Sequence, residues 1–136
     1  MNNGRFQIAV HIMTLLHLGE NEQLSSEYMA GSINANPALI RKELSNLRKH
    51  NLVNSKEGKT GGYQLGKPAH LITMADIYVA VKQDSVLGEA RNQPNPNCTV
   101  GKSINKNVAS INTDLDKLIY DKLGKQTLAE FSKQFH

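Results

Sequence analysis

Residues 36–65 read NPALIRKELSNLRKHNLVNSKEGKTGGYQL and contain two predicted elements in direct succession, a helix and a hairpin. Asn36 stands where a helix cap is expected, and Pro37 occupies the first helical position, where its missing N–H costs nothing. Three apolar residues then repeat at helical spacing and form an inward stripe: Ile40, Leu44 and Leu47. An outward stripe repeats at the same spacing: Arg41, Ser45 and Arg48, flanked by Ala38, Lys42 and Lys49. The segment therefore predicts one helix with an apolar face and a basic face.

A hairpin with a glycine-rich tip is predicted after this helix. Its two short strands are Leu52-Val53 and Tyr63-Gln64-Leu65. Gly58 and Gly61-Gly62 lie between them and allow the positive φ angles that a hairpin loop requires. The loop also carries polar and charged side chains: Lys56, Glu57, Lys59 and Thr60.

The net charge of the chain is concentrated in this same stretch. The 136 residues include 16 basic and 12 acidic side chains, which give a formal charge of +4. Residues 36–62 hold six of the basic side chains but only two acidic ones, Glu43 and Glu57, so this stretch accounts for the whole net charge. A concentrated basic segment in a near-neutral protein favours an anionic partner, with nucleic acid as the first candidate. The alternative is an ordinary solvated helix face.

Two helices are predicted before this stretch. Apolar residues cover most of the circumference of the segment 5–18, which predicts a buried helix. Ser25 or Ser26 can cap a short second helix that ends near Gly31.

The remainder of the chain predicts three more helices. Thr73 and Asp76 resemble a capping box that starts a helix running to about Lys82. Residues 88–98 form a polar loop, and apolar residues recur at helical spacing after it for roughly twenty residues. Gly124 can close this long helix, and a second capping box at Thr127 starts a short last helix.

This order of elements is that of a winged helix-turn-helix domain, so the predicted fold class is mainly α with a small β-hairpin. In such a domain the basic helix enters the major groove, about 12 Å wide, and the hairpin reaches the neighbouring groove or backbone. Arginine reads guanine edges with two hydrogen bonds, whereas lysine mainly supplies charge against phosphates. The predicted DNA-binding residues are Ser25, Ser26, Asn36, Arg41, Lys42, Ser45, Arg48, Lys49, Lys56, Lys59 and Thr60. The alternative is a winged-helix interaction module whose basic face docks an acidic protein.

Several segments resemble the Rrf-two family of bacterial regulators, which includes iron–sulfur, nitric-oxide and cysteine-metabolism regulators. The matching segments are Leu24-Ser25-Ser26-Glu27, the run from Leu47 to Ser55, Gly61-Gly62-Tyr63-Gln64-Leu65 and the run from Leu71 to Ile77. The run from Asn95 to Lys102 is similar to the YwnA-like branch, found in low-GC Gram-positive bacteria. The likeness covers nearly the whole chain. It implies a homodimeric transcriptional regulator, usually a repressor, whose long C-terminal helix crosses over its partner.

The chain departs from the family pattern at two places. Cluster-binding members carry three cysteines in the loop before the dimer helix, whereas this chain has Cys98 alone. One thiolate falls short of the usual ligation, so no iron–sulfur cluster and no other cofactor is expected. Members with a wing arginine often place it where this chain has Glu57. An acidic residue there repels phosphate, which leaves the phosphate contacts of the wing to Lys56 and Lys59.

The predicted long helix carries a narrow apolar seam that is difficult to bury against one small domain. The seam consists of Val100, Ile104, Val108, Ile111, Leu115 and Leu118. Pairing with a second copy of the chain would bury it, and two-fold symmetry would place two recognition helices about 34–36 Å apart on a palindromic operator in double-stranded DNA. The alternative is a core stripe buried within one chain.

Cys98 directly precedes the predicted long helix, where unpaired N–H groups and the helix dipole favour a thiolate. Oxidation or thiol modification there would tilt the dimer and release DNA. The alternative is a small residue that caps or packs the start of the helix. The sequence identifies no small-molecule effector.

Other function classes are disfavoured by the motifs that are missing. The sequence has no Walker loop, dinucleotide glycine pattern, nucleophile elbow or His-Glu-x-x-His motif, and no histidine pair has metal-ligand spacing, so neither an enzyme nor a metal site is predicted. A secretory signal and a membrane span are also not predicted, so the expected location is the cytoplasm.

The expected division of the chain is a DNA-binding domain over 1–83, a loop over 84–98, and a dimerisation helix with the C-terminal helix over 99–136.

Overall fold

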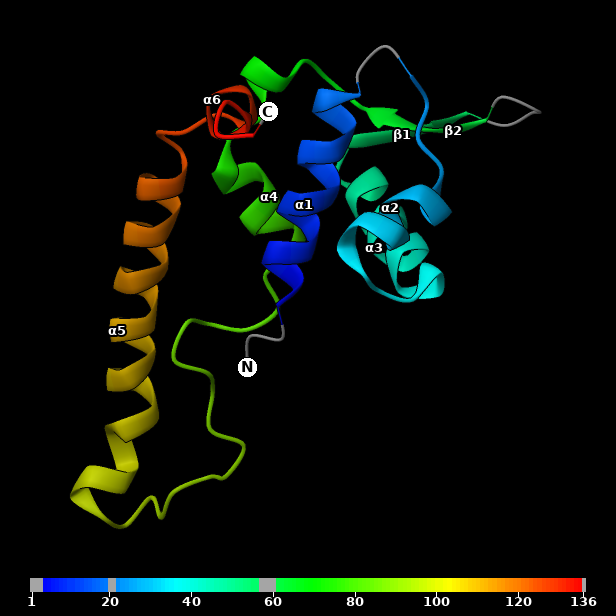
Figure 1. Ribbon diagram of the computed structural model, residues 1–136. Helices are drawn as coiled ribbons and strands as arrows, with labels where there is room; N and C mark the ends of the chain where they lie inside the picture. Colours follow the sequence, from blue (N-terminus) through cyan, green and yellow to red (C-terminus); the bar gives the residue numbers. More distant parts are fainter. Residues whose placement is uncertain (1–3, 20–21, 57–60, 136) are drawn as a thin grey trace.

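The computed structural model describes residues 4–19, 22–56 and 61–135. Its elements follow one another in the order α1 (Arg5–Leu18), α2 (Ser26–Ile33), α3 (Pro37–Lys49), β1 (Val53–Lys56), β2 (Gly62–Leu65), the 3-10 helix η1 (Ala69–Leu71), α4 (Met74–Val81), α5 (Thr99–Leu123) and α6 (Leu128–Ser132). The fold is mainly helical with one two-stranded antiparallel sheet, which confirms the predicted fold class. Figure 1 shows α1 to α4 and the hairpin grouped together, with α5 standing along one side of this group.

The core is built around α1, which is surrounded by the other short helices and the hairpin. Side chains on most of its circumference are buried, as predicted for a helix that is apolar on nearly every side. Ile12 and Met13 have no exposed surface, and they pack with Ile40 and Leu44 of α3 and Ile77 of α4 in a single apolar cluster. The core therefore holds α3 by its apolar stripe and leaves the opposite side of that helix outward.

The helices α2 and α3 form the helix-turn-helix, and each starts at a side-chain cap. The Ser25 hydroxyl accepts a hydrogen bond from the Tyr28 N–H at 3.0 Å. Of the two serines that the sequence offers as the cap of α2, Ser25 is therefore the one that caps it. The Asn36 side chain accepts one from the Ala38 N–H at 2.8 Å, with Pro37 in the first turn as predicted. Asn34 ends α2 with a φ of +61°, the left-handed conformation that asparagine tolerates better than most residues.

The hairpin is anchored to the segment before α2. Its register pairs Val53 with Leu65 and Lys56 with Gly62. Leu24 and Tyr63 exchange backbone hydrogen bonds of 2.8 and 3.2 Å and form an isolated β-bridge beside β2. A Cβ at Gly62 would lie 2.8 Å from the Leu24 carbonyl oxygen, so this close approach requires glycine. The first strand runs over 53–56 rather than 52–53, because the Leu52 N–H still donates to the Leu47 carbonyl oxygen of α3, at 3.0 Å.

The start of α6 pairs with the start of α4, and each of these helices begins with a capping box. Thr73 pairs with Asp76, and Thr127 pairs with Glu130, in the reciprocal hydrogen bonds that the sequence predicts. Thr73 and Thr127 also face each other in an isolated β-bridge. Leu128 has no exposed surface and packs against the cluster around α1. The short C-terminal helix therefore completes the core around α1, although it follows α5 in the chain.

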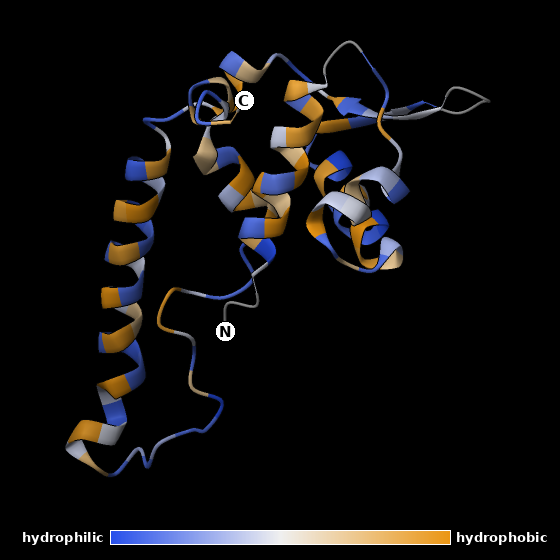
Figure 2. Ribbon diagram, in the orientation of Figure 1, coloured by the Kyte–Doolittle hydropathy of each residue, from blue (hydrophilic) through white to orange (hydrophobic). Residues whose placement is uncertain are grey.

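The helix α5 is 25 residues long and ends at Gly124. Figure 2 shows its apolar residues along the side that points away from the other helices. No helix in the described ranges is both long enough and apolar enough to cross a lipid bilayer.

Candidate nucleic-acid interface

The helix-turn-helix and the hairpin lie together on the side of the molecule opposite α5 (Figure 1). The outward side of α3 carries the predicted polar and basic side chains, and all of them are exposed: Arg41, Lys42, Ser45, Arg48 and Lys49. Their spacing places them away from the buried residues of the same helix, Ile40, Glu43, Leu44 and Leu47. This arrangement offers positive charge along one exposed helix face.

Lys42, Arg48 and Lys49 make no ion pair with any residue that the structure describes. Their charges are therefore available to an anionic partner. The last turn of α3 holds Arg48 and Lys49, where positive charge also complements the negative end of the helix dipole. His50 caps this end, with its Nδ1 3.0 Å from the Asn46 carbonyl oxygen.

Arg41 differs from the other basic residues because it contacts α2. Its Nη1 lies 3.6 Å from Oε1 of Glu27, and both side chains are largely exposed. Pairs of this kind are weak in water, at about 0–1 kcal/mol, so phosphate or base edges can compete for the guanidinium. The sequence places Glu27 in the first turn of α2 but gives no sign of this pair.

The predicted polar residues at the two helix starts serve as caps or are buried. The Ser25 hydroxyl and the Asn36 Oδ1 each accept a backbone N–H, as described above. Ser26 is only 5% exposed, and its hydroxyl donates to Glu27 Oε2 at 3.2 Å. A phosphate contact at Ser26 would therefore come from its backbone N–H.

The hairpin contributes one described basic residue, Lys56, which is exposed at the end of β1. Lys59 and Thr60, and the acidic Glu57 of the same loop, lie outside the residues that the structure describes.

A buried ion pair connects α3 to the start of α1. Glu43 is 2% exposed, and both of its carboxylate oxygens lie 3.2 Å from Nε of Arg5. An uncompensated carboxylate in this position would be costly, and the Arg5 guanidinium supplies the opposite charge inside the domain. The sequence carries a partial signal for this pair, because Glu43 stands between the apolar positions 40, 44 and 47 and a buried acid requires a partner.

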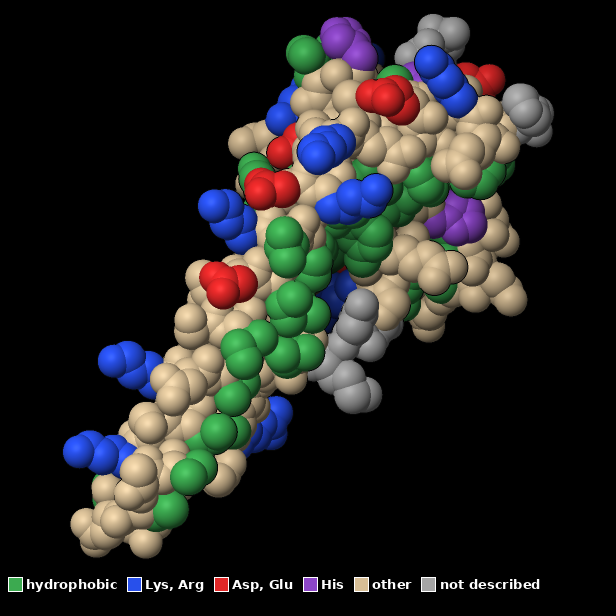
Figure 3. Space-filling model, turned by 90° about the vertical axis from the view of Figure 1, so that its left-hand side faces the viewer, with side chains coloured by type: hydrophobic (Ala, Val, Ile, Leu, Met, Phe, Trp, Pro, Cys, Tyr) green, Lys and Arg blue, Asp and Glu red, His purple; other side chains and the backbone are tan. Residues whose placement is uncertain are grey.

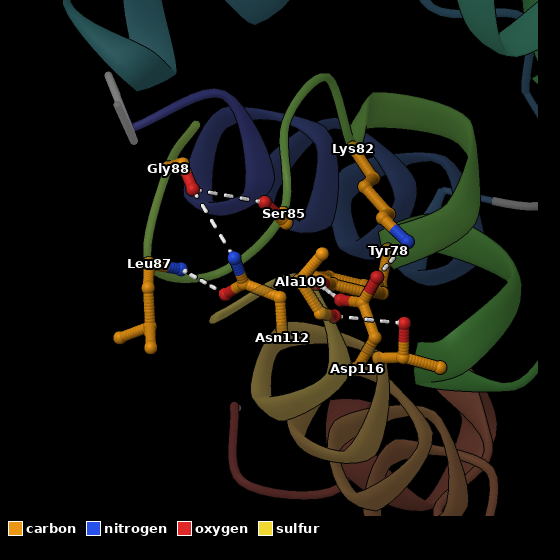
Figure 4. Close-up of polar contacts among 9 residues, drawn as sticks. Tyr78, Lys82, Ser85, Leu87, Gly88, Ala109, Asn112 and Asp116 are labelled. Carbon is orange, nitrogen blue, oxygen red and sulfur yellow. Dashed lines mark hydrogen bonds and ion pairs between the residues drawn. The ribbon is translucent and has the colours of Figure 1, made fainter. Parts of the chain in front are cut away.

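A second set of polar contacts joins α5 to α4 and to the linker between them (Figure 4). Asp116 of α5 accepts a hydrogen bond from the Tyr78 hydroxyl at 3.0 Å and pairs with the Lys82 ammonium. Asn112 accepts from the Leu87 N–H at 3.0 Å and donates to the Gly88 carbonyl at 3.2 Å. These contacts hold α5 against α4 and the linker between them.

The contacts around Asp116 also shift two pKa values. The hydrogen bond from Lys82 is the main reason that the pKa of Asp116 lies below its ordinary value, with Tyr78 acting in the same direction and partial burial opposing it. Burial is the largest cause of the raised pKa of Tyr78, and the hydrogen bond to Asp116 and the charge of that carboxylate add to it. Both shifts favour an ionised Asp116 facing a protonated Tyr78.

Cys98 lies at the cap position of α5 and is exposed. Backbone N–H groups, first of Gly101 and then of Val100, lower the pKa of its thiol, although the side chain makes no cap hydrogen bond. Cys98 directly precedes α5, as the sequence predicts.

The apolar seam of α5 is exposed along most of its length, and Figure 3 shows it as a continuous line of apolar side chains. The exposed fractions are 66% for Val100, 38% for Ile104, 37% for Val108, 52% for Ile111 and 64% for Leu118, while Leu115 is half-buried. Where α5 meets α4 and the linker, two of its polar residues, Asn112 and Asp116, form hydrogen bonds with them. A single chain therefore leaves the seam without a covering surface.

Comparisons with known proteins give one consistent result. The Rrf2 (Rrf-two) family profile, described as an iron-dependent transcriptional regulator, matches residues 2–134. YwnA of Bacillus subtilis (strain 168), which is named an HTH-type transcriptional regulator, is 31% identical over 130 residues, 96% of each chain. A solved structure described as a DNA binding protein superposes with a TM-score of 0.75 at 28% identity, over 93% of this chain and 97% of the other. CymR, the global cysteine regulator of B. subtilis, has the same fold, with a TM-score of 0.69 at 22% identity over 100% of this chain and 98% of its own.

The iron named in the family description finds no matching ligand set here. The described ranges contain no group of three or more His, Cys, Asp or Glu side chains placed to hold a metal ion. Cys98 is the single cysteine of the chain. The residues present therefore do not fit an iron centre of the usual thiolate type.

Proposed function

Because the chain belongs to the Rrf2 family of transcriptional regulators, we propose that it is a homodimeric repressor that binds a palindromic operator in the cytoplasm. The chain is a DNA-binding regulator and not an enzyme. The observation that carries the proposal is the outward face of α3, where Lys42, Arg48 and Lys49 are exposed and have no ion-pair partner among the described residues.

The proposed contacts follow from the position of each side chain. Lys42, Ser45, Arg48 and Lys49 lie on the exposed face of α3 that would enter the major groove, and Arg41 of the same helix pairs with Glu27 of α2. The start of α2 offers backbone N–H groups at Ser26 to a phosphate, since helix starts bind anions. The wing residue Lys56, with Lys59 and Thr60 of the same loop, would contact the neighbouring backbone or groove.

The proposed dimer forms through the apolar seam of α5. Burial of five side chains that are between 37% and 66% exposed in one chain supplies the driving force for pairing. A two-fold axis along this seam presents two copies of α3 to one side of the DNA, and half-sites about 34–36 Å apart would accommodate them.

Cys98 is the proposed redox-responsive group of this regulator. Its thiol is exposed, its pKa is lowered, and it lies at the first residue before the dimerisation helix. Oxidation of the thiol would change the start of α5 and weaken operator binding. Peroxide treatment is expected to lower the DNA affinity of the wild type and to leave that of Cys98→Ser unchanged. Equal loss in both proteins would place the sensor elsewhere.

The main experiment is selection of bound sequences from a random duplex pool with the reduced protein, followed by fluorescence anisotropy across a salt series. A palindromic motif whose binding falls steeply with salt is the expected result, because each phosphate contact releases counterions. Failure to enrich any motif, together with weak binding to all duplexes, would overturn the operator proposal. Salt-insensitive capture of an acidic protein would then favour an interaction module.

A further inference from the structure

The first turn of α3 presents an exposed apolar surface. Pro37, Ala38 and Leu39 are consecutive, and all three are exposed, Leu39 to 40%. We call these three residues the apolar tip. One exposed leucine needs no explanation, but this one lies at the start of the helix that a winged helix-turn-helix domain inserts into the major groove.

The backbone of the apolar tip has no N–H group left for a phosphate. Pro37 has none, and the Ala38 N–H donates to Oδ1 of Asn36 at 2.8 Å. The N–H groups of Leu39 and Ile40 both donate to the Asn36 carbonyl oxygen, at 3.0 and 3.2 Å. Although helix starts commonly bind anions, this one has its donors satisfied within the chain.

Two polar side chains near the tip are held by neighbouring helices, whereas Lys42, three residues after Leu39, is exposed and has no ion-pair partner among the described residues. Arg41 lies on the α2 side of α3, paired with Glu27. Asn46 lies on the α4 side, where its amide donates to the Ala80 carbonyl oxygen at 2.7 Å. Leu39 precedes Asn46 by seven residues, so the two share one side of the helix. In the first turn of α3, Ala38 is therefore exposed on the outward side and Leu39 on the side of α4.

We propose that the apolar tip reads the 5-methyl groups of thymines, with Leu39 as a specificity-determining residue. The inference rests on the proposed function, in which α3 enters the major groove of an operator. Among the groups on base edges there, the thymine methyl is the apolar one, and apolar side chains recognise it by contact. The operator should accordingly carry thymine opposite the tip in each half-site, and guanine or cytosine there would leave the tip against polar groups.

The test uses the operator obtained by selection and replaces its thymines one at a time by deoxyuridine, which removes only the methyl group. Dissociation constants are measured by anisotropy at one salt concentration for the wild type, Leu39→Ala and Leu71→Ala. Leu71 is a matched control, because it is an exposed leucine, 57% exposed, in η1 near α6. Alanine is a good helix former, so Leu39→Ala should fold normally.

The expected result is that one or two substitutions in each half-site weaken wild-type binding about fourfold, the change that corresponds to about 0.8 kcal/mol for one methyl-sized group. The same substitutions should have no effect on Leu39→Ala and the full effect on Leu71→Ala. The proposal is overturned if the wild type tolerates deoxyuridine at every position, or if Leu39→Ala shows the same losses as the wild type. A protein that selects no sequence would overturn the proposed function itself.

Discussion

At the scale of single residues, Arg48 is the simplest test of the proposed contact face. It lies eleven residues after Pro37, about 16 Å along α3, so in the proposed complex it would reach the DNA backbone while the first turn meets the bases. We expect Arg48→Ala to weaken binding to all duplexes by a similar factor and to reduce the salt slope by about one. Anisotropy titrations over a salt series measure both quantities.

Lys133→Ala is the control for this substitution, because Lys133 is an exposed cation beside α6, remote from α3. It should leave the affinity and the salt slope unchanged. An Arg48→Ala protein with wild-type affinity at fixed salt would show that the DNA lies against a different face of α3.

Asp116 gives a prediction about pH. Its folded pKa is lowered, chiefly by the hydrogen bond from Lys82, so its ionised form stabilises the folded protein at all pH values above its unfolded pKa of about 3.9. This contribution is lost as the pH falls from there through the lowered folded pKa. We expect Asp116→Asn to reduce the free energy of unfolding by about 0.5–1 kcal/mol at pH 7.

Urea unfolding at pH 7, at pH 5 and below pH 3.9 tests the pH range over which the ionised Asp116 stabilises the protein. The difference between Asp116→Asn and the wild type should persist at the first two values and shrink at the third. Asp114→Asn, an exposed carboxylate on the same helix, is the control and should show no such difference. A constant difference at every pH would assign the loss to packing rather than to charge.

At the scale of elements, the position of α3 depends on the buried pair between Arg5 and Glu43. Removal of Arg5 leaves a carboxylate that is 2% exposed without its cation. We expect Arg5→Met to lower the free energy of unfolding by about 3 kcal/mol, and the double variant Arg5→Met/Glu43→Leu to regain most of this loss. Chemical denaturation of the three proteins provides the measurement. A single variant as stable as the wild type would mean that Glu43 is held by other contacts.

The elements themselves were largely predictable from the sequence, because their signals are local. Asn36 with Pro37, and the capping boxes at Thr73 and Thr127, each lie within four residues of the helix start that they specify. The long helix was also predicted from its apolar period, at roughly twenty residues. In the structure it has 25 residues, from Thr99 to Leu123. The first strand was placed too early, since the Leu52 N–H still bonds to the end of α3, and the second helix runs to Ile33 rather than ending near Gly31.

The contacts that position the candidate site could not be predicted in the same way. Arg5 and Glu43 are 38 residues apart, as are Tyr78 and Asp116. Nothing in the local pattern of either residue specifies its partner, because such a pair depends on how whole helices pack. The same holds for Glu27 and Arg41, which meet only because α2 crosses α3.

At the scale of the whole molecule, the exposed seam of α5 predicts the oligomeric state. Ile111 is 52% exposed near the middle of the seam, where an aspartate would have to be buried in the proposed dimer. We expect Ile111→Asp to change the mass in solution from twice 15.0 kDa to that of one chain, and to reduce operator affinity strongly. Light scattering coupled to size exclusion measures the mass.

Lys106→Asp is the control for the same helix. Lys106 is exposed and lies on the side of α5 away from the seam, so the variant should remain a dimer. A wild type that is monomeric at micromolar concentration would contradict the proposed pairing, as would an Ile111→Asp protein that remains dimeric.

The packing of α6 against α1 has a consequence for how the protein is made. Leu128 has no exposed surface in a core whose other members come mostly from the first 81 residues. The recognition helix is therefore synthesised some eighty residues before the side chain that completes its support. During translation the ribosome must produce the whole of α5 before the DNA-binding half can close. A nascent chain thus acquires its dimerisation helix before its finished DNA-reading shape, and a message truncated before residue 128 would yield a fragment without a complete core.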